Sequence, residues 1–371
     1  MKPIQYSYAR DILMEGYPGD TCRISPEAFK TPDGHMHILY RHLLLSGSDV
    51  FMGSSVISSA DGGRTFGKPQ PLDPLPDSFE NGIRTTHSMA PRYHAASNSM
   101  YAVGRVTRYA NDKEPIVVGE DKMPALIGDF DWKAMRYTGC SRLDIDTPVM
   151  RQYAAVTFME PLDEPDGTIL IPAYCSGAFT TRSQVVVIRF KMENGKLVYV
   201  ENGRPVIRNE LKRGVGEPRI ARLGNKYYMT LRSDEIGWMA ESDDGLNYSE
   251  PTVWKWDDGE ILTSRNTQQA WLMHPDGLFL VYTRETPHNQ HVFRRRAPLF
   301  MARFDEDRNC LVKDTEIIAV PEMGARLGNF TVVNMKENEA WICVCEWMQT
   351  DPKVCESYGA NNRLWRVHVM W

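Results

Sequence analysis

Short runs of apolar residues, or of alternating apolar and polar residues, recur along the whole chain, whereas helical periodicity is scarce. Alternation with a period of two is typical of β-strands that bury one face. One unit repeats: an apolar strand, a polar turn, and then a strand rich in aromatic and β-branched residues, as in RIARLGNKYYMTLRS and AWLMHPDGLFLVYTR. The pattern therefore predicts an all-β protein.

The turns of this unit recur roughly every sixty residues and centre near residues 33, 98, 166, 225, 276 and 338. A repeat of roughly 40 to 60 residues with several strands per unit is typical of β-propellers. We therefore expect six four-stranded antiparallel blades, with seven possible if residues 105–150 contain another. No Pro/Gly/Ser-rich linker interrupts the series, which predicts a single domain over residues 1–371. The segment SYARDILMEGYP is expected to add a strand beside RLWRVHVMW in the last blade.

Composition narrows the possible partners and cofactors. The 371 residues are 42% hydrophobic and 25% charged, with a net charge of −5 and a pI near 6.0. This balance favours neither nucleic acid nor an anionic membrane as partner, so any attraction for anions must be local. The seven cysteines lack C-x-x-C spacing and no nucleotide-binding motif is present, so we expect no metal and no cofactor. Oligomeric state stays open.

The chain contains no apolar run of signal-peptide or membrane-span length. We therefore expect a cytoplasmic protein, or a secreted one if a leader has been removed.

The stretch SSADGGRTF follows the first repeat unit, and ESDDGLNYSEP follows the fourth in the same relative place. In the first stretch, two adjacent glycines supply the positive φ angles of a tight turn, and Ser59 and Asp61 can hydrogen-bond local backbone amides. A turn that recurs at equivalent positions indicates architecture. We interpret both stretches as hairpin staples on the outside of a blade.

Together these features resemble the sialidase (neuraminidase) superfamily, whose propeller blades carry the Asp-box, or BNR repeat, Ser-x-Asp-x-Gly-x-Thr-Phe/Trp. Residues 59–66 match every position of that box, and SDDGLNY is a shortened variant. The resemblance covers nearly all of the chain. It implies a glycoside hydrolase that acts on a terminal acidic sugar or oligosaccharide, whose carboxylate is held by three arginines.

The resemblance assigns those arginines to Arg23, in TCRISPEAF with Ser25 inserted before the proline, to Arg232, and to Arg296, favoured over Arg294 and Arg295. Three arginines from three blades would converge at the propeller axis, and a planar guanidinium pairs a carboxylate with two parallel hydrogen bonds. The alternative is that they are ordinary blade residues that bridge to Asp or Glu.

The resemblance also implies an acid/base aspartate at Asp49 and, at Glu217, the glutamate that polarises the nucleophile. The tyrosine nucleophile of the family would stand where this sequence has Asn329 and Phe330. Neither residue can form the covalent intermediate of a retaining enzyme. An inverting or otherwise atypical glycosidase is therefore favoured. Asp49 has the alternative of a solvated surface carboxylate.

The second repeat unit offers another chemistry. It contains His94 and resembles, more faintly, propellers that act on uronic-acid glycans, including rhamnosyl-glucuronate hydrolases and ulvan lyases. In a lyase, His94 would take the C5 proton, and Arg92 or Arg108 would stabilise the carboxylate as it gains enediolate character. The alternative for His94 is a hydrogen-bonded structural histidine. A third hypothesis is a propeller that binds an acidic glycan without catalysis.

Overall fold

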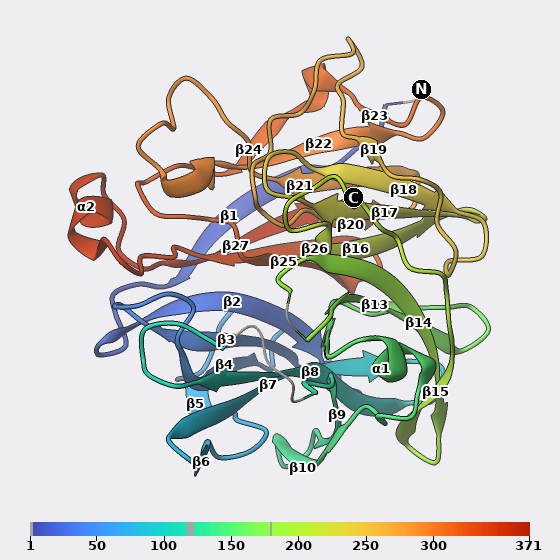
Figure 1. Ribbon diagram of the computed structural model, residues 1–371. Coiled ribbons are helices and arrows are strands. Elements are labelled where there is room, and N and C mark those ends of the chain that lie inside the picture. Colours follow the sequence, from blue (N-terminus) through green and yellow to red (C-terminus); the bar gives the residue numbers. More distant parts are fainter. Residues whose placement is uncertain (1–2, 117–121, 179) are drawn as a thin grey trace. The chain divides into compact units, whose positions relative to one another are not determined.

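The computed structural model describes residues 3–116, 122–178 and 180–371 (Figure 1). These residues form six antiparallel sheets, three with four strands and three with five. This strand content is that of a six-bladed β-propeller, and the predicted fold class is confirmed. The fifth strands are the one detail that differs from the expectation of four-stranded blades.

The chain divides into two compact units. The terminal unit comprises residues 1–28 and 217–371, and the middle unit comprises residues 29–216. The boundaries fall within two strands, β2 (Thr21–Lys30) and β16 (Gly216–Leu223).

Three sheets lie mainly in the terminal unit. The first contains β1 (Ser7–Met14), β27 (Leu364–Met370), β26 (Glu339–Cys345) and β25 (Phe330–Lys336). The second contains β16, β17 (Lys226–Arg232), β18 (Trp238–Ser242) and β19 (Thr252–Val253). The third contains β20 (Ala270–His274), β21 (Gly277–Tyr282), β22 (Leu299–Asp305), β23 (Cys310–Leu311) and β24 (Ile317–Val320). The terminal unit also contains the short helices α2 (Pro352–Ser357), η1 (Phe293–Arg295) and η2 (Lys313–Thr315).

The remaining sheets belong mainly to the middle unit. One contains β2, β3 (Met36–Leu44), β4 (Phe51–Ser59) and β5 (Gln70–Pro71). The next contains β6 (Ser78–Glu80), β7 (Ile83–His94), β8 (Ser99–Tyr109), β9 (Leu126–Asp131) and β10 (Arg136–Arg142). The last contains β11 (Ala155–Phe158), β12 (Leu162–Asp163), β13 (Thr168–Ser176), β14 (Ser183–Glu193) and β15 (Lys196–Asn202), preceded by α1 (Pro148–Gln152).

The two ends of the chain meet in one sheet. β1 pairs antiparallel with β27, from Ser7 opposite Met370 to Met14 opposite Leu364, as Figure 1 shows in blue and red. The predicted closure by the N-terminal segment is therefore confirmed. The possible seventh blade is not formed by the described residues, because β9 and β10 extend the sheet of β6 to β8.

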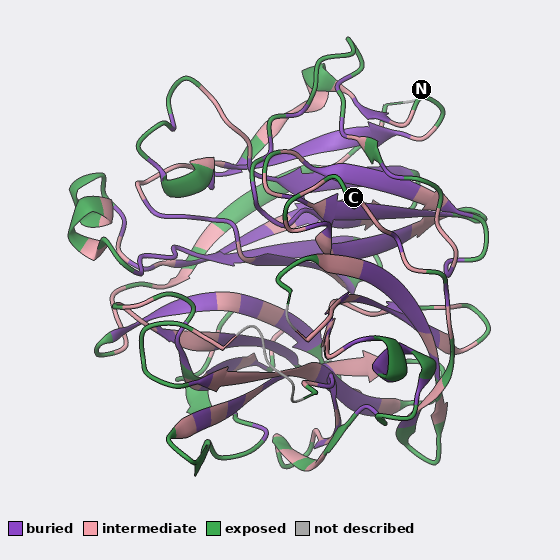
Figure 2. Ribbon diagram, in the orientation of Figure 1, coloured by how far each residue is buried: buried purple, intermediate pink, exposed green. Residues whose placement is uncertain are grey.

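Each predicted repeat turn joins two neighbouring antiparallel strands, as between β7 and β8 or between β20 and β21. In the terminal unit, the sheets pack face to face: one apolar cluster joins β20–β22 to β25–β27, and another joins β16–β18 to the other face of β20–β22. Central strands such as β22 and β26 are consequently buried along their whole length (Figure 2). Burial on both faces explains their nearly continuous apolar runs.

In each of the two Asp-box-like turns, one aspartate oxygen accepts from a serine hydroxyl and from two backbone amides. In the first, which joins β4 to β5, Asp61 Oδ1 accepts from the Ser59 hydroxyl and from the amides of Arg64 and Thr65, at 2.8 to 2.9 Å. In the second, which joins β18 to β19, Asp244 Oδ1 accepts from Ser242 and from the amides of Leu246 and Asn247, at 2.7 to 2.9 Å. Both turns link the third and fourth strands of their sheets, and their own serine and aspartate side chains tie each turn together.

Among the described residues, no helix is both long and apolar enough to cross a bilayer.

Candidate functional site

Glu217 and Arg232 form an ion pair in the terminal unit. Glu217 lies at the start of β16 with a φ of 47°, a left-handed conformation that is strained for a glutamate. Arg232 ends the neighbouring strand β17, and its Nη1 donates to Glu217 Oε1. The two side chains are 23% and 19% exposed, so solvent reaches the pair. The unusual backbone of Glu217 therefore directs its carboxylate to the end of the adjacent strand.

Asn266 connects this pair to a second arginine. Its side-chain Oδ1 accepts from Arg232 Nε at 2.7 Å and also from Arg232 Nη2. Its backbone carbonyl accepts from Arg296 Nη2. Asn266 also has a positive φ, 41°, which asparagine tolerates better than most residues. One residue thus holds two guanidinium groups by two different acceptors.

Arg296 is buried among other cations. Its side chain is 3% exposed, and its Nε has no hydrogen-bond partner among the described residues. Burial lowers the pKa of Arg296, and the neighbouring guanidinium groups of Arg232, Arg294 and Arg326 lower it further, whereas Glu217 opposes them. A guanidinium stays protonated near neutral pH. The lowered pKa therefore marks a position where a further negative charge would be stabilised.

Glu217 is the negative charge that faces this cluster. Burial raises the pKa of its carboxyl group, but Arg232, Arg296 and Arg219 outweigh burial and hold the pKa below the usual glutamate range. Glu217 is consequently ionised at neutral pH, so it can accept a proton and cannot donate one.

Asn329 and Phe330 stand where the resemblance expects the tyrosine nucleophile, and Gly328 directly precedes them. A Cβ on Gly328 would lie 2.7 Å from Arg296 Cδ and 3.0 Å from Thr267 Oγ1, so the glycine leaves room for the arginine. Asn329 Nδ2 donates to Ser25 Oγ over 3.3 Å. Ser25, within β2, has a φ of 47°, a left-handed conformation that departs from the extended backbone of a strand.

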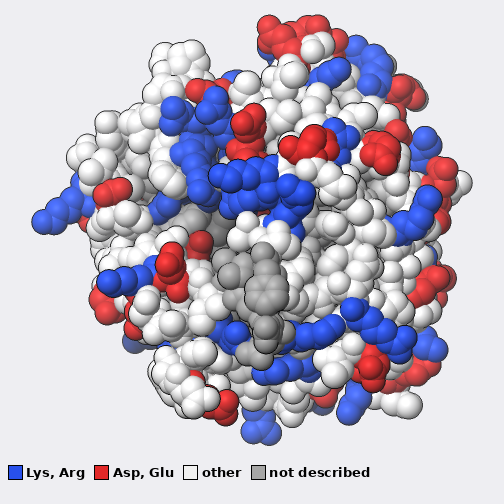
Figure 3. Space-filling view, viewed as in Figure 1, with Lys and Arg blue, Asp and Glu red and all other residues white. Residues whose placement is uncertain are grey.

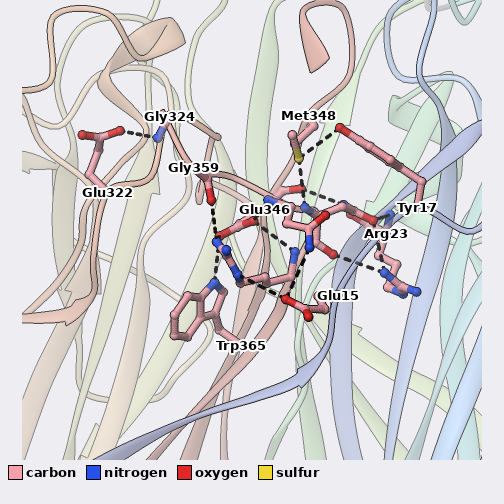
Figure 4. A network of polar contacts seen from close by, with 12 residues as sticks. Glu15, Tyr17, Arg23, Glu322, Gly324, Glu346, Met348, Gly359 and Trp365 are labelled. Carbon is pink, nitrogen blue, oxygen red and sulfur yellow. Dashed lines mark hydrogen bonds and ion pairs between the residues drawn. The ribbon is translucent and has the colours of Figure 1, made fainter. Parts of the chain in front are cut away.

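Arg23 lies in the same unit, within a separate network of hydrogen bonds (Figure 4). Its side chain is buried, and Nη1 donates to the carbonyl oxygens of Gly16 and Asn362 and to Asn362 Oδ1. The neighbouring Glu346 accepts from Trp365 Nε1 at 3.1 Å and from Arg363 Nη1 at 3.0 Å. The Arg23 guanidinium is thus positioned by the backbone oxygens of Gly16 and Asn362 and by the side-chain amide oxygen of Asn362.

Asp49 and His94 both belong to the middle unit, near opposite ends of the β7–β8 hairpin. The backbone carbonyl of Asp49 accepts from Tyr109 Oη at 2.7 Å, and Tyr109 pairs with Arg84. His94 ends β7 at the turn. Ten residues of strand separate Arg84 from His94, which corresponds to roughly 33 Å. One small site therefore cannot include both Asp49 and His94.

The environments of these two residues differ. Asp49 is exposed and has a φ of 55°. The charge of Asp49 acts on the neighbouring Arg105. Burial alone would lower the pKa of Arg105, but Tyr174, Tyr109 and Asp49 raise it. His94 is 2% exposed and is hydrogen-bonded through Nδ1 to Ser97 Oγ at 2.7 Å, a contact within its own hairpin turn. That contact matches the structural alternative for His94.

Sequence reasoning missed Asn266 and its neighbours. The segment SRNTQQ, just before β20, contains no apolar residue, yet five of its six side chains are buried: Ser264, Asn266, Thr267, Gln268 and Gln269. Gln268 Nε2 donates to the Phe330 carbonyl at 2.5 Å, and Gln269 Nε2 donates to Ser264 Oγ at 2.6 Å. A polar run directly before an apolar strand was the available signal, because buried amides need partners.

Positively charged side chains also gather on the surface. In the view of Figure 3, Lys and Arg side chains gather over elements of the terminal unit, with acidic side chains beside them. Among the residues that the structure describes, no group of three or more His, Cys, Asp or Glu side chains is placed to hold a metal ion.

Comparisons with known proteins support the fold. No family model matches the chain, and no curated protein matches it. Among solved structures, it is similar to a Hadza microbial sialidase (10% identity, TM-score 0.61, 87% of this chain and 63% of that one). It is also similar to the phage phi92 endosialidase (12%, 0.61, 98% and 69%) and to an α-L-arabinanase from Penicillium chrysogenum (13%, 0.51, 98% and 98%). The chain thus spans less than two thirds of that sialidase. At these identities the similarity shows a shared fold.

Proposed function

We propose that this protein is a sialidase-like glycoside hydrolase that acts on a terminal sugar bearing a carboxylate. The observation that supports the proposal is the arrangement of Arg232 and Arg296 around Asn266, with ionised Glu217 beside them. Both guanidinium groups are held in place before a ligand binds, which reduces the entropy that binding must overcome. A carboxylate is a planar acceptor that matches a guanidinium.

In the proposed site, Arg232 and Arg296 bind the sugar carboxylate. Arg23, on β2 of the same unit, is proposed as the third arginine of this site. Because the Arg296 side chain is 3% exposed, a bound carboxylate would meet its charge in surroundings from which water is largely excluded. Such binding orients the sugar ring and leaves its anomeric carbon toward the carboxylate of Glu217.

We propose that hydrolysis is a single displacement. Glu217 accepts a proton from water, the water oxygen bonds to the anomeric carbon, the glycosidic C–O bond breaks, and the leaving oxygen takes a proton from a general acid. The lowered pKa of Glu217 keeps its carboxylate ionised at neutral pH, which is the form that can accept a proton. Asn329 offers no nucleophilic oxygen comparable to a phenolate, so inversion at the anomeric carbon is expected.

The experiment incubates the purified protein with sialosides, uronate-terminated oligosaccharides and neutral glycosides. Released sugar, its initial anomer by NMR, and the ultraviolet absorbance of unsaturated uronate are recorded together. We expect an acidic sugar with inverted configuration and no new absorbance. Glu217→Gln should lower kcat/KM by roughly a hundredfold or more, and Arg232→Lys should act mainly on KM. Glu80→Gln and Arg136→Lys, at exposed positions of the middle unit, are the matched controls.

Each other outcome contradicts the proposal in a distinct way. New ultraviolet absorbance that is lost in His94→Ala would identify a uronate lyase. Saturable binding of acidic sugars without any product would identify a glycan-binding propeller. If only neutral sugars were released, the arginines would have no carboxylate to bind, and their proposed role would be wrong.

A further inference from the structure

Five side chains of the terminal unit alternate between guanidinium groups and aromatic rings. Arg296 Cζ lies 5.4 Å from the ring centroid of Trp347, and Arg326 Cζ lies 4.0 Å from the same ring. Arg326 Cζ is also 5.1 Å from the ring centroid of Phe293, and Arg294 Cζ is 5.0 Å from it. We call this set, Arg296, Trp347, Arg326, Phe293 and Arg294, the cation–aromatic ladder.

The ladder runs from the interior to the surface. Arg296, Trp347 and Arg326 are 3%, 7% and 8% exposed, whereas Phe293 is 55% exposed and Arg294 is exposed as well. Its buried end is the arginine of the candidate site. Its other end presents a phenyl ring, an apolar surface of a size that proteins usually bury. The ladder therefore connects the candidate site to solvent.

The backbone holds the ladder in place. Arg326 and Trp347 exchange two backbone hydrogen bonds, of 3.2 and 2.9 Å, and the amide of Leu327 donates to the Arg296 carbonyl at 2.5 Å. Arg294 lies within η1 with a φ of 55°, a left-handed conformation. Rigid support of this kind is typical of a surface that binds a ligand, because less order has to be imposed on binding.

The chemistry of the ladder matches an acidic oligosaccharide. Guanidinium groups bind carboxylates or sulfates, and an exposed aromatic ring stacks on the C–H face of a sugar. Four successive separations of 4.0 to 5.4 Å link these cationic and aromatic groups from the buried Arg296 to the exposed Phe293 and Arg294. An oligosaccharide is favoured over nucleic acid because the buried end of the ladder, Arg296, belongs to the proposed sugar site.

We infer that Phe293, Arg294 and Arg326 form a second subsite, which binds a further charged unit of an oligosaccharide whose terminal acidic sugar occupies the Arg232 and Arg296 site. The substrate class is then an oligosaccharide with acidic groups on more than one unit. This inference rests on the proposed function, since it takes Arg296 as the binding residue for the terminal unit.

The test measures affinity as a function of ligand length. Galacturonic acid and its trimer, and sialic acid and its α-2,8-linked trimer, are titrated by calorimetry against the wild type, Phe293→Ala and Arg294→Ala. In one of the two series, the trimer is expected to bind roughly tenfold more tightly than the monomer in the wild type. Each variant should lose most of that ratio and keep its monomer affinity. Phe79→Ala and Arg136→Ala replace an exposed phenylalanine and arginine of the middle unit and serve as controls.

Several results would overturn the inference. Equal affinity for monomer and trimer in both series, full retention of the ratio in Phe293→Ala and Arg294→Ala, or no binding of any of the four acids would each do so. Binding of a single-stranded oligothymidylate that is lost in the same two variants would assign the ladder to nucleic acid instead.

The two proposals fail separately. A length-dependent affinity without hydrolysis would remove the proposed reaction and keep the subsite. Hydrolysis with identical kcat/KM for monomeric and trimeric substrates would keep the reaction and remove the subsite.

Discussion

Gly328 lies directly against the side chain of Arg296, so that a methyl group on its Cα would come within 2.7 Å of Arg296 Cδ. Its φ is not in the left-handed region, so space and not backbone conformation excludes a larger residue here. The neighbouring amide of Leu327 donates to the Arg296 carbonyl, which prevents the segment from moving aside easily. The position of a buried guanidinium thus depends on the absence of a side chain.

Gly328→Ala is expected to displace the Arg296 guanidinium and to weaken binding of an acidic sugar by roughly tenfold or more. Overpacking should cost about 1–3 kcal/mol of stability. Calorimetric titration and urea unfolding measure the two effects. Gly67→Ala, where the nearest atom is 3.7 Å away, should change neither. Unchanged affinity in Gly328→Ala would show that Arg296 does not bind the ligand.

Stability should depend on pH through Glu217. Burial raises its pKa, but Arg232, Arg296 and Arg219 lower it below the unfolded value. A depressed pKa stabilises the fold above the unfolded value of about 4.3 and loses that effect as pH falls through the folded value. Wild type should therefore exceed Glu217→Gln in stability at pH 7, and the gap should shrink in acid.

Urea unfolding of wild type and Glu217→Gln at pH 7, 5 and 3 measures this gap. Glu80→Gln, at an exposed residue of the middle unit, provides the comparison. A gap that stays constant from pH 7 to pH 3 would contradict the assigned electrostatics.

The second staple turn should resist acid. Burial raises the pKa of Asp244, but hydrogen bonds from Asn247, Leu246 and Ser242 together outweigh burial and lower the pKa to about 2. The turn should therefore lose its contribution only as pH falls from about 4 toward that value. Asp244→Ala should cost about 1 kcal/mol, because the side chain is exposed and water screens its hydrogen bonds. Thermal unfolding beside Asp243→Ala is the measurement, and equal melting temperatures would refute the staple role.

His368 should hold the N-terminal strand in its sheet. Its Nε2 lies 2.6 Å from Asp11 Oδ2 on β1, and its Nδ1 lies 2.5 Å from Glu339 Oε1 on β26. The pKa of each carboxyl is raised by burial and lowered more strongly by hydrogen bonds, from Arg366 and His368 to Asp11 and from Lys336 and His368 to Glu339. His368→Ala should ease local opening of β1 by roughly 1–3 kcal/mol.

Hydrogen exchange of the β1 amides measures this opening directly. His35→Ala changes an exposed histidine on a turn of the middle unit and should leave exchange in β1 unaffected. Exchange in β1 that is equally slow in His368→Ala and wild type would show that backbone pairing alone holds the strand.

The fold could be predicted from local chemistry in considerable detail. Alternation with a period of two predicted the strands, and polar turn residues predicted the hairpins. Both features depend on residues that are close in sequence. The pairing of β1 with β27 was also predicted, as the closure of the last blade by the N-terminal segment. The sequence did not predict that β9 and β10 join the sheet of β6 to β8. Strand pairing over a long connection depends on which sheet edge is free.

The candidate site, like the fold, could be predicted from the sequence only in part. Residue type and the resemblance pointed to Glu217, Arg232 and Arg296 from the sequence alone, whereas their connection through Asn266 did not appear there. The ladder, the space left by Gly328, and the bond from Asn329 to Ser25 join residues as far as 304 positions apart. The sequence by itself determined the strands, the staple turns and the chemical groups available. Only the tertiary structure decided which groups meet, because side-chain contacts depend on how sheets pack and not on order along the chain.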